Sequence, residues 1–166
     1  LIFSSSMLAL LEVCGEIKNG RVLGIDIDIR EHNKKLIQDH PMKKKITMIE
    51  GSSISETIVD QVIKFSKNSK NIMVILDSNH THDHVLKELE LYGPLVSKNN
   101  YCIVMDTIVE DMPKDSYPDR PWDVGNNPKT AIKKYLESHA EFEIDEEIQN
   151  KLLITSSPDG YLKKIK

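Results

Sequence analysis

Residues 72–84 read IMVILDSNHTHDH, an apolar run that closes on an aspartate and a cluster of histidines. Its first part, Ile72–Asp77, shows no alternation of polar and apolar side chains, and such runs are typical of strands buried on both faces of a parallel sheet. Other segments of the same character are Val22–Asp28, Ile46–Glu50 and Tyr101–Met105. We therefore predict that these segments form strands of one sheet.

Segments with a helical pattern lie between the predicted strands. In Ser55–Ser66, for example, Ile58, Val59 and Val62 fall on one face of a helix. The other predicted helices are Ser6–Val13, Glu31–Gln38, Thr81–Tyr92 and Pro128–Ser138. Because helices and strands alternate along the chain, the pattern predicts an α/β fold with right-handed crossovers.

The last third of the chain departs from this alternation. Glu110–Lys129 contains Pro113, Pro118, Pro121 and Pro128, which predicts a long loop of the kind that usually serves function. We interpret it as a lid over a substrate. Further on, Leu152–Thr155 and Tyr161–Ile165 flank a Pro-Asp-Gly turn, and this pattern predicts an antiparallel hairpin.

Composition restricts the classes of function. The chain has 166 residues, the size of a single domain, and 39% of them are hydrophobic, enough for a core. A formal net charge of −4 gives no electrostatic footprint for nucleic acid, and no apolar run reaches the ~20 residues that span a membrane. Cys14 and Cys102 lie in apolar runs, which favours buried thiols. The lack of a secretory pattern predicts a cytoplasmic protein.

Acidic or small polar residues follow each predicted strand. They are Asp26 and Asp28, then residues 50–53 (EGSS), then residues 77–80 (DSNH), then Asp106. Open α/β sheets bind ligands at the carboxyl ends of their strands. Such residues also terminate strands and cap helices, but their repetition at every strand end favours a ligand crevice.

Particular residues suggest particular chemistry. Asp26 suits the two ribose hydroxyls of a nucleotide cofactor, and Gly51 permits a ring to approach the backbone, although an ordinary turn explains Gly51 equally well. Asp77 and Asp106, at the ends of neighbouring strands, suit Mg²⁺. His80 at a strand end suits a general base. A zinc site shared by His80 and His84 has less support, since the HExxH pattern is absent.

The sequence resembles the cephalosporin hydroxylase / rhamnosyl O-methyltransferase family over nearly its whole length. The strings that carry the resemblance are VLGIDIDIREHN, IEGSS, ILDSNHTHDHVLKELELYGPLV, DTIVEDMP, RPW with GNNPKTA, and NKLLITSSPDGYLKK. The family has the class I S-adenosylmethionine-dependent methyltransferase fold, a three-layer Rossmann-like structure. Its sheet is mostly parallel and ends in an antiparallel strand.

The resemblance implies roles for individual residues. Asp26 and Asp28 would bind the ribose end of S-adenosylmethionine, Gly51, Ser52 and Ser53 would lie beside the adenine, and Asp77 would border the same cofactor. Asp77 and Asp106 would bind Mg²⁺ next to the substrate oxygens, and His80 would deprotonate the acceptor hydroxyl. The substrate contacts from the lid would be Trp122, Asn126 and Asn127.

Two departures from the family pattern matter. Relatives often have an acidic residue where this chain has Met105, and a thioether is a poor ligand for Mg²⁺, so metal binding is expected to be weaker unless water, Glu110 or Asp111 fills the position. The family's glycine motif and first strand are also missing. We expect an upstream segment of about 40–70 residues that supplies them, because a sheet without its central strand leaves backbone groups unpaired.

The expected function is therefore O-methylation of a sugar or secondary metabolite, which is a small-molecule substrate. Self-association into a homo-oligomer is left open. Three alternatives remain. One is a cephalosporin hydroxylase-like enzyme that acts on a β-lactam. The second is a nicotinamide-dependent oxidoreductase, since Asp26 would also suit its ribose. The third is a non-catalytic S-adenosylmethionine-binding scaffold, which Met105 motivates.

Overall fold

The strands pair in two sheets in the computed structural model, which describes residues 20–166. The first sheet has the order β1-β2 and the second the order β3-β4-β6-β5. The chain divides into two compact units, Leu1–Phe65 and Ser66–Lys166, and each sheet belongs to one of them. The α/β class is confirmed, whereas the single domain stays a prediction. The predicted helix Ser6–Val13 and Cys14 lie outside the described residues.

The first unit is built on a parallel strand pair. β1 (Val22–Asp26) lies beside β2 (Ile46–Glu50), with Asp26 opposite Glu50. β1 ends earlier than predicted because the Asp26 carboxylate accepts a hydrogen bond from the backbone of Asp28 and turns the chain. The helical segments of this unit are α2 (Glu31–Asp39), η1 (Lys43–Lys45) and α3 (Glu56–Ser66).

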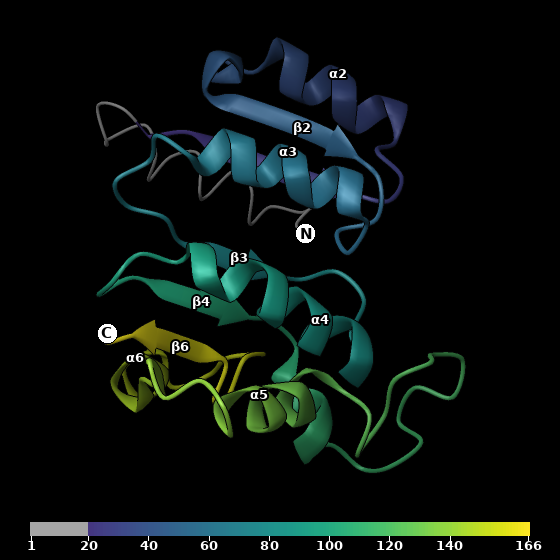
Figure 1. The fold of residues 1–166 in the computed structure, drawn as a ribbon. Coiled ribbons are helices and arrows are strands. Elements are labelled where there is room, and N and C mark those ends of the chain that lie inside the picture. Colours follow the sequence, from purple (N-terminus) through teal and green to yellow (C-terminus); the bar gives the residue numbers. More distant parts are fainter. Residues whose placement is uncertain (1–19) are drawn as a thin grey trace. The chain divides into compact units, whose positions relative to one another are not determined.

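The second unit has the larger sheet and the larger core. β3 (Val74–Leu76) pairs in parallel with β4 (Tyr101–Val104), and α4 (His82–Tyr92) lies across one face of these strands (Figure 1). Leu76, Leu89, Cys102 and Val104 are almost completely buried between them. The predicted burial of Cys102 is confirmed, and this burial raises the pKa of its thiol to about 12.

The predicted C-terminal hairpin is wrong in its first strand. Of the residues expected there, Leu152 is the last residue of α6 (Glu146–Leu152), which Asp145 caps by accepting from the Glu147 N–H, and residues 153–155 form no strand. Leu153 then leaves the helix with a φ of 63°, which no strand accommodates. β6 (Tyr161–Lys164) instead pairs antiparallel with β4 on one side and with β5 (Phe142–Ile144) on the other.

The remaining elements surround the predicted lid. η2 (Gly93–Leu95) follows α4, η3 (Thr107–Asp111) precedes the lid, and α5 (Pro128–Leu136) follows it and packs on α4. The irregular part of the lid is therefore shorter than the predicted Glu110–Lys129 and covers residues 112–127. Among residues 20–166, no helix is long and apolar enough to cross a membrane.

The base of the lid is closed by a polar network around Asn127, which is completely buried. Its side-chain oxygen caps α5 by accepting from the backbone of Lys129 and Thr130, and its amide donates to Glu110 Oε2 and to the Asp123 carbonyl. The same Glu110 carboxylate accepts from the Gly125 N–H at 2.8 Å. The two ends of the lid are thus joined to each other.

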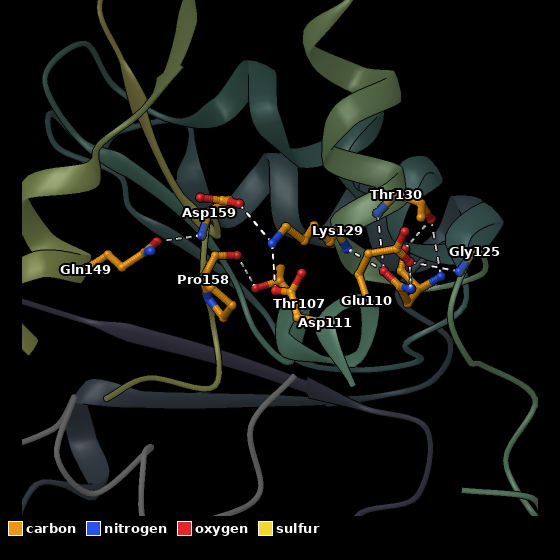
Figure 2. Close-up of polar contacts among 10 residues, drawn as sticks. Thr107, Glu110, Asp111, Gly125, Lys129, Thr130, Gln149, Pro158 and Asp159 are labelled. Carbon is orange, nitrogen blue, oxygen red and sulfur yellow. Dashed lines mark hydrogen bonds and ion pairs between the residues drawn. The ribbon is translucent and has the colours of Figure 1, made fainter. Parts of the chain in front are cut away.

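A second contact fixes the lid base to the C-terminal turn (Figure 2). Lys129 Nζ lies 2.7 Å from Asp111 Oδ2 and 3.0 Å from Asp159 Oδ2, and its side chain is only 11% exposed. Thr107 Oγ1 donates to the Pro158 carbonyl at 2.6 Å. These contacts connect η3, α5 and the turn before β6, which explains why an irregular loop has a defined base.

Replacement of Asn127 tests this network. Asn127→Ala removes the helix cap and leaves buried partners unpaired, so we expect a loss of about 2–4 kcal/mol in the free energy of unfolding. Asn127→Ser keeps a capping oxygen and loses the amide donors, so its loss should be about half as large. Urea denaturation followed by circular dichroism measures both. Equal losses for the two variants would contradict the contribution of the amide contacts.

Candidate functional site

The site begins where β3 and β4 end side by side. Their parallel register pairs Leu76 with Val104, and the Met105 N–H donates to the Leu76 carbonyl at 2.9 Å. Asp77 and Asp106 follow directly, so both carboxylates lie at the same edge of the sheet. The sequence prediction that these two residues end adjacent strands is confirmed.

Asp77, His80 and Asp106 form a cluster with one ligand atom from each within 4.8 Å of the others. In the described part of the chain this is the one group of three His, Cys, Asp or Glu side chains close enough to share a metal ion. His80 Nε2 lies 3.4 Å from Asp106 Oδ2. The arrangement offers two carboxylates and an imidazole to a ligand, all partly exposed.

Burial and backbone geometry make this cluster costly for the fold. Burial raises the pKa of the Asp77 carboxyl, and the neighbouring Asp106 carboxylate raises it further. Asp106 adopts a φ of 56°, a left-handed conformation that is uncommon for residues other than glycine. Such strain together with adjacent like charges is typical of functional sites.

His80 lies in the loop before α4 rather than on the helix, as predicted for a base at a strand end. α4 begins at His82, and His84 Nε2 lies 3.5 Å from Glu88 on the same helix. His80 and His84 therefore do not share a helical face, and the zinc site that we considered does not form. Thr81 occupies the N-cap position of α4 without a capping bond from its side chain, and the Ser78 hydroxyl donates to Glu88.

The lid contacts the His80 loop at two points. The Trp122 ring meets the His80 ring edge-on, with 5.7 Å between centroids, and Tyr117 lies 5.0 Å from Trp122. Asn126 Oδ1 accepts from the His82 N–H at 3.0 Å, so the lid satisfies a free amide at the start of α4. This hydrogen bond and the contacts between the aromatic rings bring the predicted lid residues next to the cluster.

The three predicted substrate contacts differ in what they leave exposed. Trp122 keeps partial exposure beside His80. Asn126 uses its oxygen on His82 and its amide on the Pro121 carbonyl. Asn127 is buried with both side-chain groups bonded, so the structure assigns it to the lid base instead of to a substrate.

The metal ligands suggested to replace the one lost at Met105 are bonded elsewhere. Glu110 holds Gly125 and Asn127, and Asp111 holds Lys129. Met105 itself turns its sulfur to Ser157, whose hydroxyl lies 3.4 Å away. The third protein donor next to Asp77 and Asp106 is therefore His80.

In the first unit, the predicted cofactor residues also gather at a strand edge. The Gly51 N–H donates to the Asp26 carbonyl at 2.7 Å, which places residues 51–53 beside the end of β1. Gly51 has a φ of 150°, and a Cβ there would lie 2.9 Å from Ile58 Cδ1, so glycine is required. Asp28 is exposed and Ser53 is buried. Ile27, between the two aspartates, is 72% exposed, and the apolar pattern of β1 gave no indication of this.

Solved structures with a similar fold are methyltransferases. MycE methyltransferase from the mycinamycin biosynthetic pathway, in complex with Mg, SAH and mycinamycin VI, aligns with a TM-score of 0.54 and 13% identity. The alignment covers 89% of this chain and 37% of MycE. A second crystal form of MycE with Mg and SAH gives a TM-score of 0.52 and 15% identity. The fold is thus the Rossmann-like fold of the S-adenosylmethionine-dependent methyltransferases.

The sequence comparisons identify the family. Residues 1–165 match the family described as rhamnosyl O-methyltransferase/CmcI, and the chain belongs to this family. The rhamnosyl O-methyltransferase of Mycobacterium tuberculosis is 32% identical over 119 residues, which are 70% of this chain and 46% of that protein. The Mycobacterium leprae protein of the same name is 28% identical over 86% of this chain and 58% of its own length. The chain spans about half the length of the curated relatives that it matches.

The raised pKa of Asp77 yields a prediction about stability. A carboxyl whose pKa is higher in the folded state favours folding at low pH, and this contribution is lost as the pH rises through the folded-state pKa. At pH 7 the ionised Asp77 therefore opposes folding. We expect Asp77→Asn to raise the melting temperature by a few degrees at pH 7, with a smaller difference at pH 4.

Differential scanning calorimetry of both proteins at the two pH values measures this effect. Asp119→Asn, which changes an exposed lid carboxylate, is the matched control and should leave the melting temperature unchanged. A lower melting temperature for Asp77→Asn at pH 7 would contradict the assignment of Asp77 as an unfavourably buried charge.

Proposed function

We propose that the protein is an S-adenosylmethionine-dependent O-methyltransferase that acts on a hydroxyl group of a sugar or secondary metabolite. The single observation that carries this proposal is the cluster of Asp77, His80 and Asp106 at the ends of β3 and β4. Membership of the rhamnosyl O-methyltransferase/CmcI family and the name of the mycobacterial relatives support it.

Residues of the first unit are proposed to bind the cofactor. Asp26 keeps one carboxylate oxygen beyond the bond from Asp28, and a carboxylate accepts the hydroxyls of a ribose. Gly51, Ser52 and Ser53 follow β2 next to it, where a flat ring has access to backbone. When bound, S-adenosylmethionine supplies a methyl group on a sulfonium, an electrophile that a hydroxyl oxygen attacks in line.

His80 is proposed as the general base. Its Nε2 faces the Asp106 carboxylate, which stabilises a proton on that nitrogen and leaves Nδ1 to accept the proton of the acceptor hydroxyl. The proton that the acceptor hydroxyl loses would remain on His80 while Asp106 holds the ring in place. Trp122 meets the His80 ring edge-on, next to the proposed base.

Asp77 and Asp106 fit a Mg²⁺ ion. Hard carboxylate oxygens suit it, a bound cation would offset the unfavourable burial of Asp77, and water can occupy the positions that protein donors leave open. A Mg²⁺ ion held there would lower the pKa of a coordinated hydroxyl. Since Met105 turns to Ser157, we expect the ion to bind with fewer carboxylates than in relatives that have an acid at this position.

Met105 also favours the second candidate, a non-catalytic protein that binds S-adenosylmethionine. The two proposals differ in turnover and agree in cofactor binding. A cytoplasmic location, self-association and the role of residues 110–129 as a lid remain predictions that are supported by the sequence pattern.

Calorimetric titration of the intact protein with S-adenosylhomocysteine, with and without Mg²⁺, tests the cofactor proposal. We expect a dissociation constant in the micromolar range and additional heat from Mg²⁺ binding that Asp106→Asn abolishes. Absence of S-adenosylhomocysteine binding would contradict both the methyltransferase and the non-catalytic binding protein. Binding without methyl transfer to any glycoside acceptor would favour the non-catalytic protein.

The base is tested by His80→Ala. We expect kcat to fall about 10²- to 10⁴-fold, the usual contribution of a general base, while the dissociation constant of S-adenosylhomocysteine changes by less than about twofold. The control is His32→Ala, which changes an exposed histidine of α2. Turnover that survives in His80→Ala would remove this residue from the mechanism.

A further inference from the structure

Glu88 is a fully buried acidic residue in the middle of α4, with 0% of its surface exposed. It is the only carboxylate among residues 20–166 in the buried class. Burying a carboxylate costs free energy, and an apolar side chain of similar size usually serves stability as well or better. His84 Nε2 lies 3.5 Å from Glu88 on the same helix. A buried ion pair usually adds no more stability than apolar packing, so stability alone does not account for an acid at this position.

The contacts of Glu88 lead to the candidate site. The Ser78 hydroxyl donates to Glu88 Oε1 at 2.7 Å, although the two residues are ten positions apart in the sequence. Ser78 directly follows Asp77 and lies two residues before His80. A hydrogen bond to a carboxylate is stronger than one between neutral groups, so this contact holds the middle of the loop against the helix.

The surroundings of Glu88 make it a rigid anchor. Its helix neighbours Val85 and Leu89 are 3% and 0% exposed, and Cys102 of β4 is 0% exposed. Burial, together with the Glu88 charge, raises the pKa of the Cys102 thiol. The loop that carries Asp77 and His80 has no regular structure of its own, so its geometry depends on such anchors.

We propose that Glu88 is a positioning residue that sets the geometry of Asp77 and His80 through the Ser78 hydroxyl. The inference rests on the proposed function, because it concerns the same site. Catalytic groups need to be held within about 0.5 Å of the productive geometry, and a displacement of about 1 Å costs up to about 10²-fold in rate. The buried carboxylate of Glu88 thus lowers the stability of the fold somewhat and in return fixes the position of the loop.

Two substitutions separate positioning from a structural role. Glu88→Met fills a similar volume with an apolar chain, so we expect an equal or higher melting temperature but a kcat lower by about 10- to 100-fold. Glu88→Gln keeps an oxygen that accepts from Ser78, so its kcat should stay within about threefold of the natural protein. KM for S-adenosylmethionine should change little in either variant.

A double-mutant cycle identifies Ser78 as the mediator. Ser78→Ala should lower kcat about as much as Glu88→Met, and the combined variant should be no worse than either alone, because the two side chains act through one contact. Val85→Ala is the matched control on the same helix. It should lower the melting temperature and leave kcat within about twofold, since this variant keeps both the Glu88 carboxylate and the Ser78 hydroxyl.

Other outcomes overturn the proposal. Glu88→Met with unchanged kcat shows that the loop does not need this anchor. Glu88→Gln as inactive as Glu88→Met shows that the charge matters instead of the bond to Ser78, and additive losses in the cycle show that the residues act independently.

Failure of this inference is distinguishable from failure of the proposed function. Amide hydrogen exchange of residues 78–81 reports on the loop without any turnover. Exchange should accelerate by about 10-fold or more in Glu88→Met and remain near the natural rate in Glu88→Gln. If the natural protein neither binds S-adenosylhomocysteine nor transfers a methyl group, the exchange rates still decide whether Glu88 holds the loop, and unchanged exchange in Glu88→Met refutes it.

Discussion

The parallel pairing of β3 with β4 determines where the chemistry of the second unit lies. Its register places Leu76 opposite Val104, so that Asp77 and Asp106 emerge at one edge with only a short step of chain between each strand and its carboxylate. A slip of one residue would turn one of these side chains to the other face of the sheet. Cys102, Val104 and Leu162, all with 0% exposure, hold this register from the core side.

The sequence predicted this edge because it depends on local patterns and on one general rule of topology. Uninterrupted apolar runs indicated β3 and β4, and the rule that parallel strands point the same way then brought Asp77 and Asp106 together. His80 was placed correctly for the same reason, since it follows the end of a strand by a few residues.

Features that depend on tertiary contacts were not predictable in this way. Glu88 lies among the charged residues of α4 and has the appearance of a solvent-facing acid, and only the packed fold shows that Ser78 reaches it. Leu152–Thr155 has the composition of a strand, but the Asp145 cap and the two partners that β6 already has exclude it. Asn127 was predicted as a substrate contact, and nothing local in the sequence shows that its amide instead bonds Glu110.

The closed base of the lid also has an evolutionary consequence. Glu110 joins the two ends of the loop, and Lys129 binds Asp111 and Asp159 next to that junction. The loop residues between the two ends are therefore fixed at both ends. The entropy of closing a loop grows only slowly with its length. Residues 112–122 can therefore be lengthened, shortened or exchanged at little cost to the contacts that join the two ends of the loop. If this segment contacts the acceptor as proposed, its sequence is free to vary with the acceptor while the sheet edge stays intact.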